Sequence, residues 1–395
     1  MLSRRALIAS GVVGAAALPA LAERFADLAL PGGPSVRPLG PIFPQKGEMI
    51  VQRVHPPLLE TPFDVFDTGV ITPNDRFFVR WSGGVMPTSI EAKAHRLTLR
   101  GAVKQPVALT LDEVAGAGET IEVMAVNQCA GNGRGLQEPR VGGAQWAHGA
   151  MGNARWRGVR LRDVLDKARV GSNAKRVRLA GLDTPMIDGA PQFIKSLPID
   201  VARRDDVIVA WGMNGDMLPL LNGYPLRLIV PGWFATYWVK MLSDIEILDT
   251  DVDDSYFMAK TYRMPAIPVA PGDKDFPTVP ISFMPPRSWI TSHAQGARVA
   301  RGRPIELRGI AMGGDAGVAR VEVLAGGKAI PATLGRDEGT LGFRRWTLSL
   351  PPIARELVIG ARCTNANGVT QPDVQAWNPS GYARNVVERI MLVPA

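Results

Sequence analysis

Two different spacings of hydrophobic residues occur in the first two-thirds of the chain. Leu161, Val164 and Leu165 have helical spacing, so the segment that ends at Lys167 is predicted to be a helix with one apolar face. Residues 224–231 form an apolar run that closes on proline, with glycine directly after it, which is typical of a strand. Alternation of the two patterns predicts an α+β domain.

A different pattern follows residue 286. Strand-like runs recur at short intervals, and glycine pairs such as Gly313-Gly314 and Gly326-Gly327 separate them. The clearest runs cover residues 304–310, 319–324, 344–350 and 356–363. This succession of short strands and turns predicts a β-sandwich of the immunoglobulin type over residues 287–395.

Proline-rich stretches mark the expected domain boundaries. Residues 23–60 are predicted to be an extended arm, and residues 264–286 are predicted to be a linker. These stretches leave residues 61–263 as the first domain and residues 287–395 as the second. The length of 395 residues also suggests two domains.

Residues 1–22 have the pattern of an export signal. Arg4 and Arg5 precede an apolar run over residues 8–18, and the small residues of Ala20-Leu21-Ala22 suit a cleavage site before Glu23. The run is short for a membrane span, so cleavage is favoured over an uncleaved anchor. No later apolar stretch is long enough for a transmembrane helix. We therefore predict export of the folded protein to the periplasm by the twin-arginine route.

The composition is that of an ordinary globular protein, with 46% hydrophobic and 21% charged residues. The formal net charge is +8, and loss of Arg4 and Arg5 with the signal lowers it by two. Such a charge suits an anionic substrate or an acidic partner, although it could equally be a solvated surface bias. Because no dense basic stripe with interleaved aromatic residues occurs, binding to nucleic acid is not expected.

The chain has two cysteines, Cys129 and Cys363. Asn and Gly residues on both sides of Cys129 predict a loop, where the thiol could be a metal ligand, a nucleophile or inert. Cys363 lies in a strand-like stretch and is predicted to be a buried free thiol. The four histidines lack zinc-ligand spacing. A Cys-x-x-Cys-His motif is also missing from the sequence, so no attached c-type haem is expected in this chain.

The run over residues 125–134, Ala-Val-Asn-Gln-Cys-Ala-Gly-Asn-Gly-Arg, resembles the molybdenum-ligating loop of the sulfite oxidase family. Four further segments resemble the same family in the same order, which makes the resemblance much stronger than one short motif. They cover residues 72–80, 146–156, 224–232 and 377–382. The resemblance implies a mixed α/β molybdopterin-binding domain followed by an immunoglobulin-like dimerisation domain, and hence a homodimer.

The resemblance also implies the site. Cys129 would be the protein thiolate on molybdenum, and Arg80 and Arg134 would bind the sulfur oxyanion unless they are ordinary surface arginines. Tyr262 would contact a substrate or metal-bound oxygen, or else pack the domain junction. Trp146 would form a pocket wall, or else belong to the core. The residues implied in cofactor binding are Phe78, Arg80, Cys129, His148, Asn153, Asn222, Arg227 and Lys240.

Two positions depart from the family pattern. Ser82 stands where histidine is frequent, and Ser380 stands where the animal enzymes have arginine. The pocket is therefore expected to carry less positive charge, unless the nearby Arg384 compensates. The segment that contains Ser380, residues 377–382, is more similar to the bacterial sulfite dehydrogenases and to the sulfane dehydrogenase subunit of thiosulfate oxidation.

The implied function is that of a periplasmic molybdenum-dependent sulfite dehydrogenase. It would oxidise sulfite to sulfate and pass the electrons to a separate c-type cytochrome. The alternative is a sulfane dehydrogenase subunit of a thiosulfate-oxidising complex. A molybdenum reductase for oxidised methionine is a third reading, which the added β-sandwich disfavours. A cofactor-free scaffold with a docking domain is a fourth.

Overall fold

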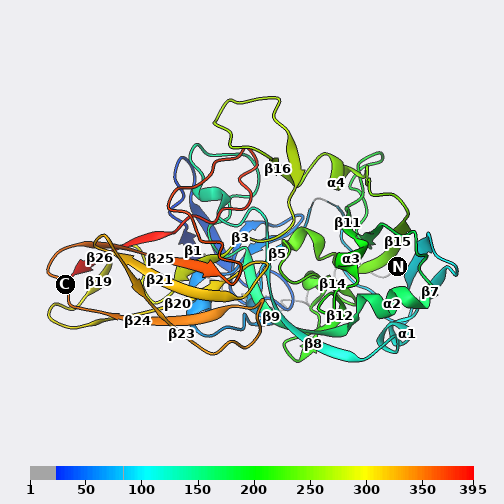
Figure 1. The fold of residues 1–395 in the computed structure, drawn as a ribbon, viewed down its shortest axis with the longest axis horizontal. Helices are drawn as coiled ribbons and strands as arrows, with labels where there is room; N and C mark the ends of the chain where they lie inside the picture. Colours follow the sequence, from blue (N-terminus) through cyan, green and yellow to red (C-terminus); the bar gives the residue numbers. More distant parts are fainter. Residues whose placement is uncertain (1–23, 83) are drawn as a thin grey trace, which may run out of the picture.

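The computed structural model describes residues 24–82 and 84–395 (Figure 1). The export signal predicted for residues 1–22 therefore lies outside the described residues. A β-sandwich occupies one end of the molecule, and the larger mixed domain occupies the other. In the described residues, no helix combines the length and the apolar character that a membrane crossing requires.

The first described residues form an antiparallel sheet, so the prediction of an extended arm for residues 23–60 is wrong. Its strands pair in chain order and are β1 (Arg24–Asp27), β2 (Val36–Gly40), β3 (Met49–Arg53), β4 (Leu58–Glu60) and β5 (Val79–Arg80). The prolines lie mostly between the strands. Met49, Val51 and Leu59 are buried against Trp81 and Met241, which attaches this sheet to the larger domain.

Two further sheets build the rest of the larger domain. One has the strand order β11-β10-β15-β6-β7, and the other has the order β13-β12-β9-β8, with β14 paired to β12. The strands are β6 (Leu97–Gly101), β7 (Val107–Leu109), β8 (Thr120–Gln128), β9 (Met151–Arg160), β10 (Arg176–Gly181), β11 (Ile194–Pro198), β12 (Ile208–Met213), β13 (Asp216–Met217), β14 (Arg227–Ile229) and β15 (Leu242–Leu248).

The α-helices of this domain are short. They are α1 (Leu111–Ala115), α2 (Leu161–Lys167), α3 (Ile199–Ala202) and α4 (Tyr256–Ala259). The 3₁₀ turns are η1 (Phe63–Asp67), η2 (Asn74–Arg76), η3 (Arg134–Leu136), η4 (Leu220–Asn222) and η5 (Ala235–Tyr237). The predicted helix is confirmed as α2, which buries Leu161, Val164 and Leu165. The predicted strand over residues 224–231 is shorter, because only β14 within it pairs.

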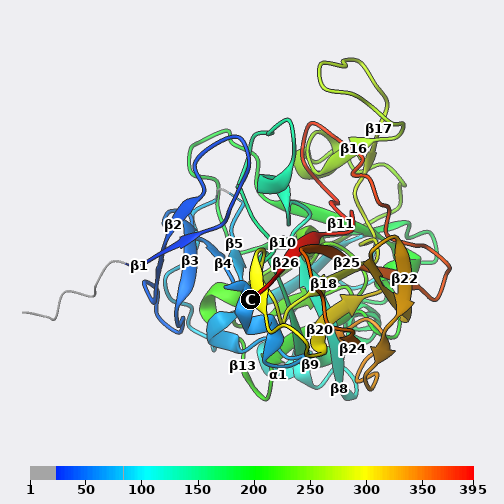
Figure 2. The same cartoon turned by 90° about the vertical axis from the view of Figure 1, so that its left-hand side faces the viewer.

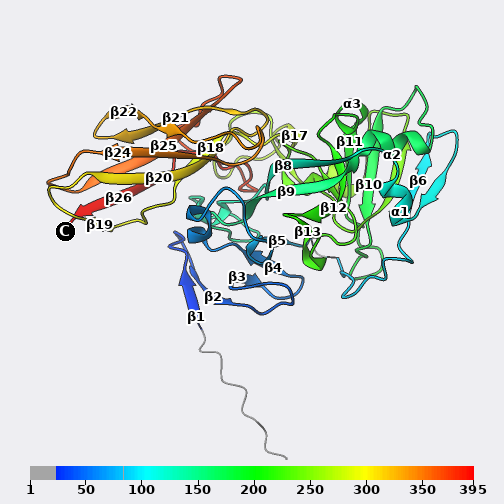
Figure 3. The same ribbon diagram turned by 90° about the horizontal axis from the view of Figure 1, so that it is seen from below.

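The predicted β-sandwich is confirmed, and Figure 3 shows its two layers. One sheet has the order β18-β20-β24-β23, and the other has the order β19-β26-β25-β21-β22. The strands are β18 (Arg287–Ile290), β19 (Ala297–Val299), β20 (Ile305–Met312), β21 (Val318–Ala325), β22 (Lys328–Pro331), β23 (Thr333–Leu334), β24 (Arg344–Leu350), β25 (Leu357–Asn365) and β26 (Arg389–Pro394). Cys363 is a fully buried free thiol on β25, as predicted.

The segment predicted to be a linker contains a small antiparallel pair, β16 (Arg263–Pro265) and β17 (Thr278–Pro280). The loop between these strands projects from the molecule (Figure 2).

The two domains share a hydrophobic cluster, which we call the junction core. It contains Phe66, Val126, Ala130, Met151, Phe234, Ile281, Met284, Trp289, Ile310, Met312 and Phe343. A backbone hydrogen bond from Val126 N to Leu341 O, 3.0 Å long, also joins β8 to the sandwich. The end of β8 is therefore held by both domains.

Candidate active site

The turn that carries Cys129 begins where β8 ends. The Cys129 amide donates to Ala150 O at 2.9 Å, and the Asn132 amide donates to Cys129 O at 3.0 Å, which closes the turn. Only 7% of Cys129 is exposed. It lines a cavity of about 660 Å³, a volume that includes the open mouth.

Seven of the residues implied by the resemblance line this one cavity. They are Phe78, Arg80, Cys129, Asn222, Arg227, Lys240 and Tyr262. They come from β5 and the residue before it, the cysteine turn, η4, β14 and the segments that follow η5 and α4. Positions that lie more than 180 residues apart in the sequence are thus brought to one site.

Four other expected residues are not among those that line the cavity. Trp146 is fully buried in the core, because its segment passes behind the cysteine turn and accepts a hydrogen bond from Gly135 N at 2.9 Å. It is a core residue and not a pocket wall. Asn153 lies on β9, where its amide group donates to Val70 O at 2.8 Å. The structure does not place these two side chains among those that line the cavity.

Arg134 and His148 also lie behind the cavity. The Arg134 guanidinium donates to Ser380 O at 2.8 Å and to Ala144 O at 3.2 Å, and it lies 5.1 Å from the ring centre of Tyr382. His148 lies beside Phe63. Burial, which outweighs the attraction of a nearby glutamate, lowers the pKa of His148 to about 4. A neutral imidazole is a poor anchor for a phosphate.

Cations surround Asn222 at the inner wall. Lys46 Nζ donates to Asn222 Oδ1 at 2.6 Å, and Arg227 Nη1 donates to Asn222 O at 2.8 Å. Lys240 Nζ donates to Arg80 O at 2.8 Å and lies 3.6 Å from the ring centre of Trp81. These cations donate to neutral oxygens and not to carboxylates. Because no carboxylate of the described residues pairs with these cations, an anion bound at this wall would be attracted to all three of them.

Burial lowers the pKa of each of these cations. The pKa of Lys46 falls to about 7 and that of Arg227 to about 9, and the pKa of Lys240 falls well below its ordinary value. Repulsion from Arg227 adds to the effect on both lysines. A bound phosphate would offset the repulsion and keep the lysines protonated.

The donor set fits a molybdopterin cofactor. Asn127 Nδ2 and Arg227 Nε are buried without a hydrogen-bond partner, and both residues line the cavity. Such atoms normally find a partner, so a ligand with acceptor groups would satisfy them. In the described residues, no three His, Cys, Asp or Glu side chains form a metal site. A metal here would bind Cys129 together with ligands that a cofactor brings.

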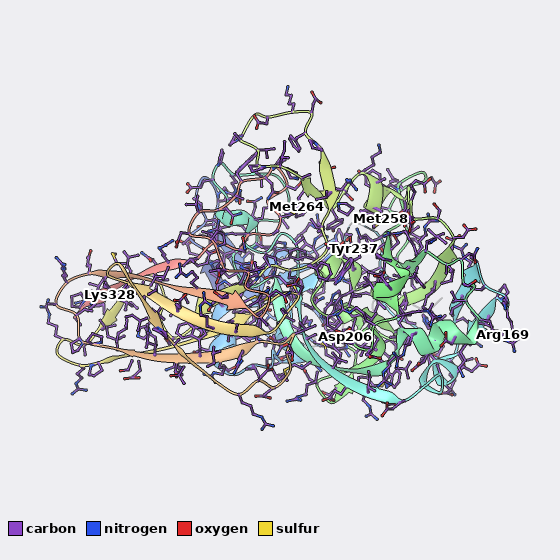
Figure 4. The ribbon with its side chains drawn as sticks, viewed as in Figure 1. Arg169, Asp206, Tyr237, Met258, Met264 and Lys328 are labelled. Atoms are coloured by element: carbon purple, nitrogen blue, oxygen red, sulfur yellow. The ribbon has the colours of Figure 1, made fainter. Side chains whose placement is uncertain are left out.

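Tyr262 faces the same cavity from the junction. Its hydroxyl lies 3.4 Å from Ser82 Oγ, and its ring stacks on Tyr382 with centroids 5.8 Å apart. The Lys195 ammonium lies 5.3 Å from the Tyr262 ring centre and 4.4 Å from that of Tyr237, which is labelled near the middle of Figure 4. The phenol is thus held between a polar mouth and a buried cation.

The two departures from the family pattern have different consequences. Ser82 lines the cavity, and its small uncharged side chain takes up less room there than the histidine that is frequent in the family. Ser380 contributes only its backbone oxygen, which holds Arg134. Arg384 does not compensate for the missing charge, because it pairs with Glu388 at 2.8 Å.

The sequence did not single out four residues of this site. Asn127 and Tyr382 lie inside two of the segments that resemble the family, residues 125–134 and 377–382, so their place in those segments could have identified them. Lys46 sits in the proline-rich stretch, and Asp183 lies between β10 and β11. No local pattern identifies these two residues, because only the tertiary fold brings Asp183 to the cavity and Lys46 to Asn222 in the cavity wall.

Comparisons with known proteins agree with this geometry. The sequence profile of the oxidoreductase molybdopterin-binding domain matches residues 83–257. Chicken sulfite oxidase is 32% identical over 340 residues, which are 82% of this chain and 73% of that protein. Human mitochondrial sulfite oxidase is 31% identical over 350 residues, and the alignment spans 84% of this chain but 63% of the human protein's length.

A solved structure has the same architecture. The sulfane dehydrogenase SoxCD from Paracoccus pantotrophus superposes with a TM-score of 0.73 at 25% identity, covering 85% of this chain and 84% of that chain. The similarity thus includes both the cavity-bearing domain and the β-sandwich. The chain belongs to the sulfite oxidase family of molybdopterin-binding oxidoreductases.

Proposed function

We propose that this chain is a molybdenum-dependent sulfite dehydrogenase. The observation that carries the proposal is the Cys129 thiol in a cavity whose inner wall is built from buried cations. The bound cofactor would supply oxygen-atom transfer and accept the two electrons, so that sulfite and water give sulfate, two protons and two electrons. Its phosphate would lie against Arg227 and Lys240, near Lys46.

The chain's own residues would bind and orient the substrate. Arg80 lines the cavity together with Arg227, and its guanidinium would bind an oxyanion through paired hydrogen bonds. Tyr262 Oη can hold a proton next to that anion. Phe78 is a buried apolar part of the cavity lining.

A direct assay tests this proposal. Metal-loaded protein would be given sulfite, thiosulfate or a protein-bound sulfane, with ferricyanide as the electron acceptor, and its molybdenum content would be measured. We expect one molybdenum per chain and turnover of sulfite. The matched control is Cys129→Ser, which should stay folded but lose turnover. Full activity in Cys129→Ser would rule out the thiolate assignment.

The second candidate is a sulfane dehydrogenase subunit. A chamber that shares Ser82, Asp183 and Phe193 with the main cavity continues past Met186. This extension offers room for a substrate longer than sulfite. Turnover of the protein-bound sulfane that is at least as fast as that of sulfite would favour this candidate.

We further propose that the protein is a periplasmic homodimer that donates electrons to a c-type cytochrome. The twin arginines of the sequence support the location, and the β-sandwich supports the dimer by its resemblance. Replacing Arg4 and Arg5 by lysine should retain the precursor in the cytoplasm, whereas an Arg24→Lys control should be exported normally. Equal export of both variants would exclude the twin-arginine route.

A further inference from the structure

The turn that carries Cys129 is held from behind by the last part of the chain. The Ala383 amide donates to Ala130 O at 2.9 Å, and the Arg384 guanidinium donates to Leu136 O at 3.2 Å. These contacts reach both the start and the end of the cysteine turn. The β-sandwich domain therefore takes part in shaping the site and does more than sit beside it.

Arg287 makes the most central of these contacts. It is the first residue of β18, and it is fully buried although its side chain is charged. Its Nη1 donates to Gln128 Oε1 and to Asn132 O, both at 3.4 Å. Gln128 and Asn132 stand on either side of Cys129, so one guanidinium contacts both ends of the turn.

The same two residues also fix the turn internally. Gln128 Oε1 accepts a second hydrogen bond, from Asn132 Nδ2 at 3.1 Å. Asn132 Oδ1 accepts from the Ala150 amide at 3.0 Å. Arg287 thus binds the polar network that sets the path of the backbone at Cys129.

A buried counter-charge keeps Arg287 in place. Glu388 Oε1 lies 3.3 Å from Arg287 Nη2, and Arg384 holds both oxygens of Glu388 at 2.8 and 2.9 Å. The Arg287 guanidinium also packs 4.4 Å from the ring centre of Trp289. A buried ion pair adds little net stability, but it can specify one geometry.

We propose that Arg287 is a positioning residue for Cys129. It links the two ends of the cysteine turn to the β-sandwich, so that the sulfur points into the cavity in one fixed direction. This inference rests on the proposed function, in which the Cys129 thiolate binds the metal. Without the guanidinium, the turn would keep its contacts with Ala383 and Arg384 but lose the one side chain that joins Gln128 and Asn132 to the second domain.

The first test needs no cofactor. The rate at which iodoacetamide alkylates Cys129 would be measured in the cofactor-free full chain of the wild type and of Arg287→Met. We expect alkylation about tenfold faster in the variant, the change produced by a local opening that is easier by about 1.4 kcal/mol. Cys363 should not be alkylated, because it is fully buried and burial raises its pKa to about 12.

Arg308→Met is the matched control. Arg308 also joins the β-sandwich to the larger domain, through a salt bridge with Asp67, but it does not touch the cysteine turn. Its alkylation rate should equal that of the wild type. Equal rates in all three proteins, or the same increase in both variants, would overturn the proposal.

The second test uses the loaded protein. In Arg287→Met, the sulfur-to-metal charge-transfer absorption should shift, and kcat for sulfite should fall while KM stays unchanged. Arg287→Lys should restore part of both, since lysine keeps the charge opposite Glu388. A lower melting temperature with a normal absorption spectrum and a normal kcat would show a purely structural role and would refute the proposal.

A second variant covers the case in which Arg287→Met does not fold. Gln128→Leu removes an acceptor that Arg287 shares with Asn132 and leaves the Arg287–Glu388 pair intact, so alkylation should also be faster in this variant. An unchanged rate in Gln128→Leu would overturn the proposal. If wild-type holoenzyme oxidises none of the sulfur substrates but the alkylation contrast is present, the proposed function fails while the positioning of Cys129 stands.

Discussion

At the scale of single residues, the main feature of the site is a group of buried cationic side chains in the wall of the cavity. Lys46 and Arg227 donate hydrogen bonds to neutral oxygens of Asn222. Lys240 donates to the backbone oxygen of Arg80. Burying such groups without an anion is costly, so binding of an anionic cofactor should return part of that free energy.

Arg80 and Arg134 should differ in their kinetic effects. Arg80→Gln removes the lining guanidinium, so kcat/KM for sulfite should fall by about 30-fold, which corresponds to roughly 2 kcal/mol. Arg134→Gln should lower kcat more than it raises KM, because Arg134 braces Tyr382 and the cysteine turn. Arg169→Gln, at the far end of the molecule in Figure 4, is the control. Unchanged kinetics in Arg80→Gln would place that residue outside the substrate site.

Lys46 should make stability depend on pH. Burial lowers its pKa in the folded protein to about 7, whereas the unfolded chain keeps an ordinary lysine pKa near ~10.4. Between these values the unfolded chain binds more protons, so the free energy of unfolding of the cofactor-free protein should rise with pH. Each unit of the difference is worth up to about 1.4 kcal/mol.

Denaturant titrations at pH 7 and pH 9 measure this rise. Lys46→Met should flatten it, whereas Lys93→Met, at an exposed position, should leave it unchanged. Cofactor loading should flatten it too, because a bound phosphate holds the proton on the lysine. An equal rise in all of the variants would show that Lys46 is not the source.

The residues of the site differ in how far the sequence could reveal them. Cys129, Arg80 and Arg227 lie in recognisable segments, and the fold brings them to the same cavity. Trp146 lies in such a segment too, but its segment passes behind the turn. Lys46 has no motif around it, because its role comes from burial against Asn222, a contact across 176 positions.

At the scale of elements, close packing requires a glycine, Gly152, near the start of β9. A Cβ on Gly152 would lie 2.5 Å from the Phe77 ring, and Phe77 stacks on Phe78 in the cavity wall. Glycine here allows a close approach between β9 and the strand that leads to the site. Gly149 has a similar role, since a Cβ would lie 1.9 Å from Thr61 O.

Gly152→Ala should therefore destabilise the protein and disturb the cavity wall. We expect a loss of about 1–3 kcal/mol in the free energy of unfolding, the usual cost of overpacking a core. Gly142→Ala is the matched control, because nothing lies within 4 Å of its added Cβ. Chemical denaturation measures both. Equal midpoints for the two variants would mean that Phe77 moves aside without cost.

Elements that depend on local pattern were predicted well. The apolar face of α2 and the strands of the β-sandwich follow from residue spacing, because each buries one side against a neighbour. The first sheet was missed. Its strands are two to five residues long and are separated by proline-rich segments, and β4 pairs with β5, a partner that follows about 20 residues later.

At the scale of the whole molecule, the junction core makes the two domains interdependent. Trp289 and Phe343 from the sandwich pack with Val126 and Ala130 next to the cysteine turn. Deletion of residues 287–395 should therefore expose apolar surface and give an aggregated or unfolded product, and not a soluble monomeric first domain. Circular dichroism and gel filtration measure this. A folded, soluble fragment would contradict it.

The intact mature protein should be a dimer in solution. Multi-angle light scattering at micromolar concentration should give twice the chain mass. Charge substitution at Val358, an exposed apolar residue on β25, should weaken the dimer if that sheet is the interface. A monomeric wild type would favour assembly with a different subunit.

The contacts behind Cys129 also determine when, during synthesis of the chain, the cofactor can be inserted. The turn belongs to the first third of the sequence, but Arg287, Ala383 and Glu388, which hold it, are synthesised much later. A nascent chain that has just exposed its cysteine to the cytoplasm cannot yet present it correctly. Cofactor insertion must then wait until translation has passed residue 388, so a chain that stalls earlier should not capture metal.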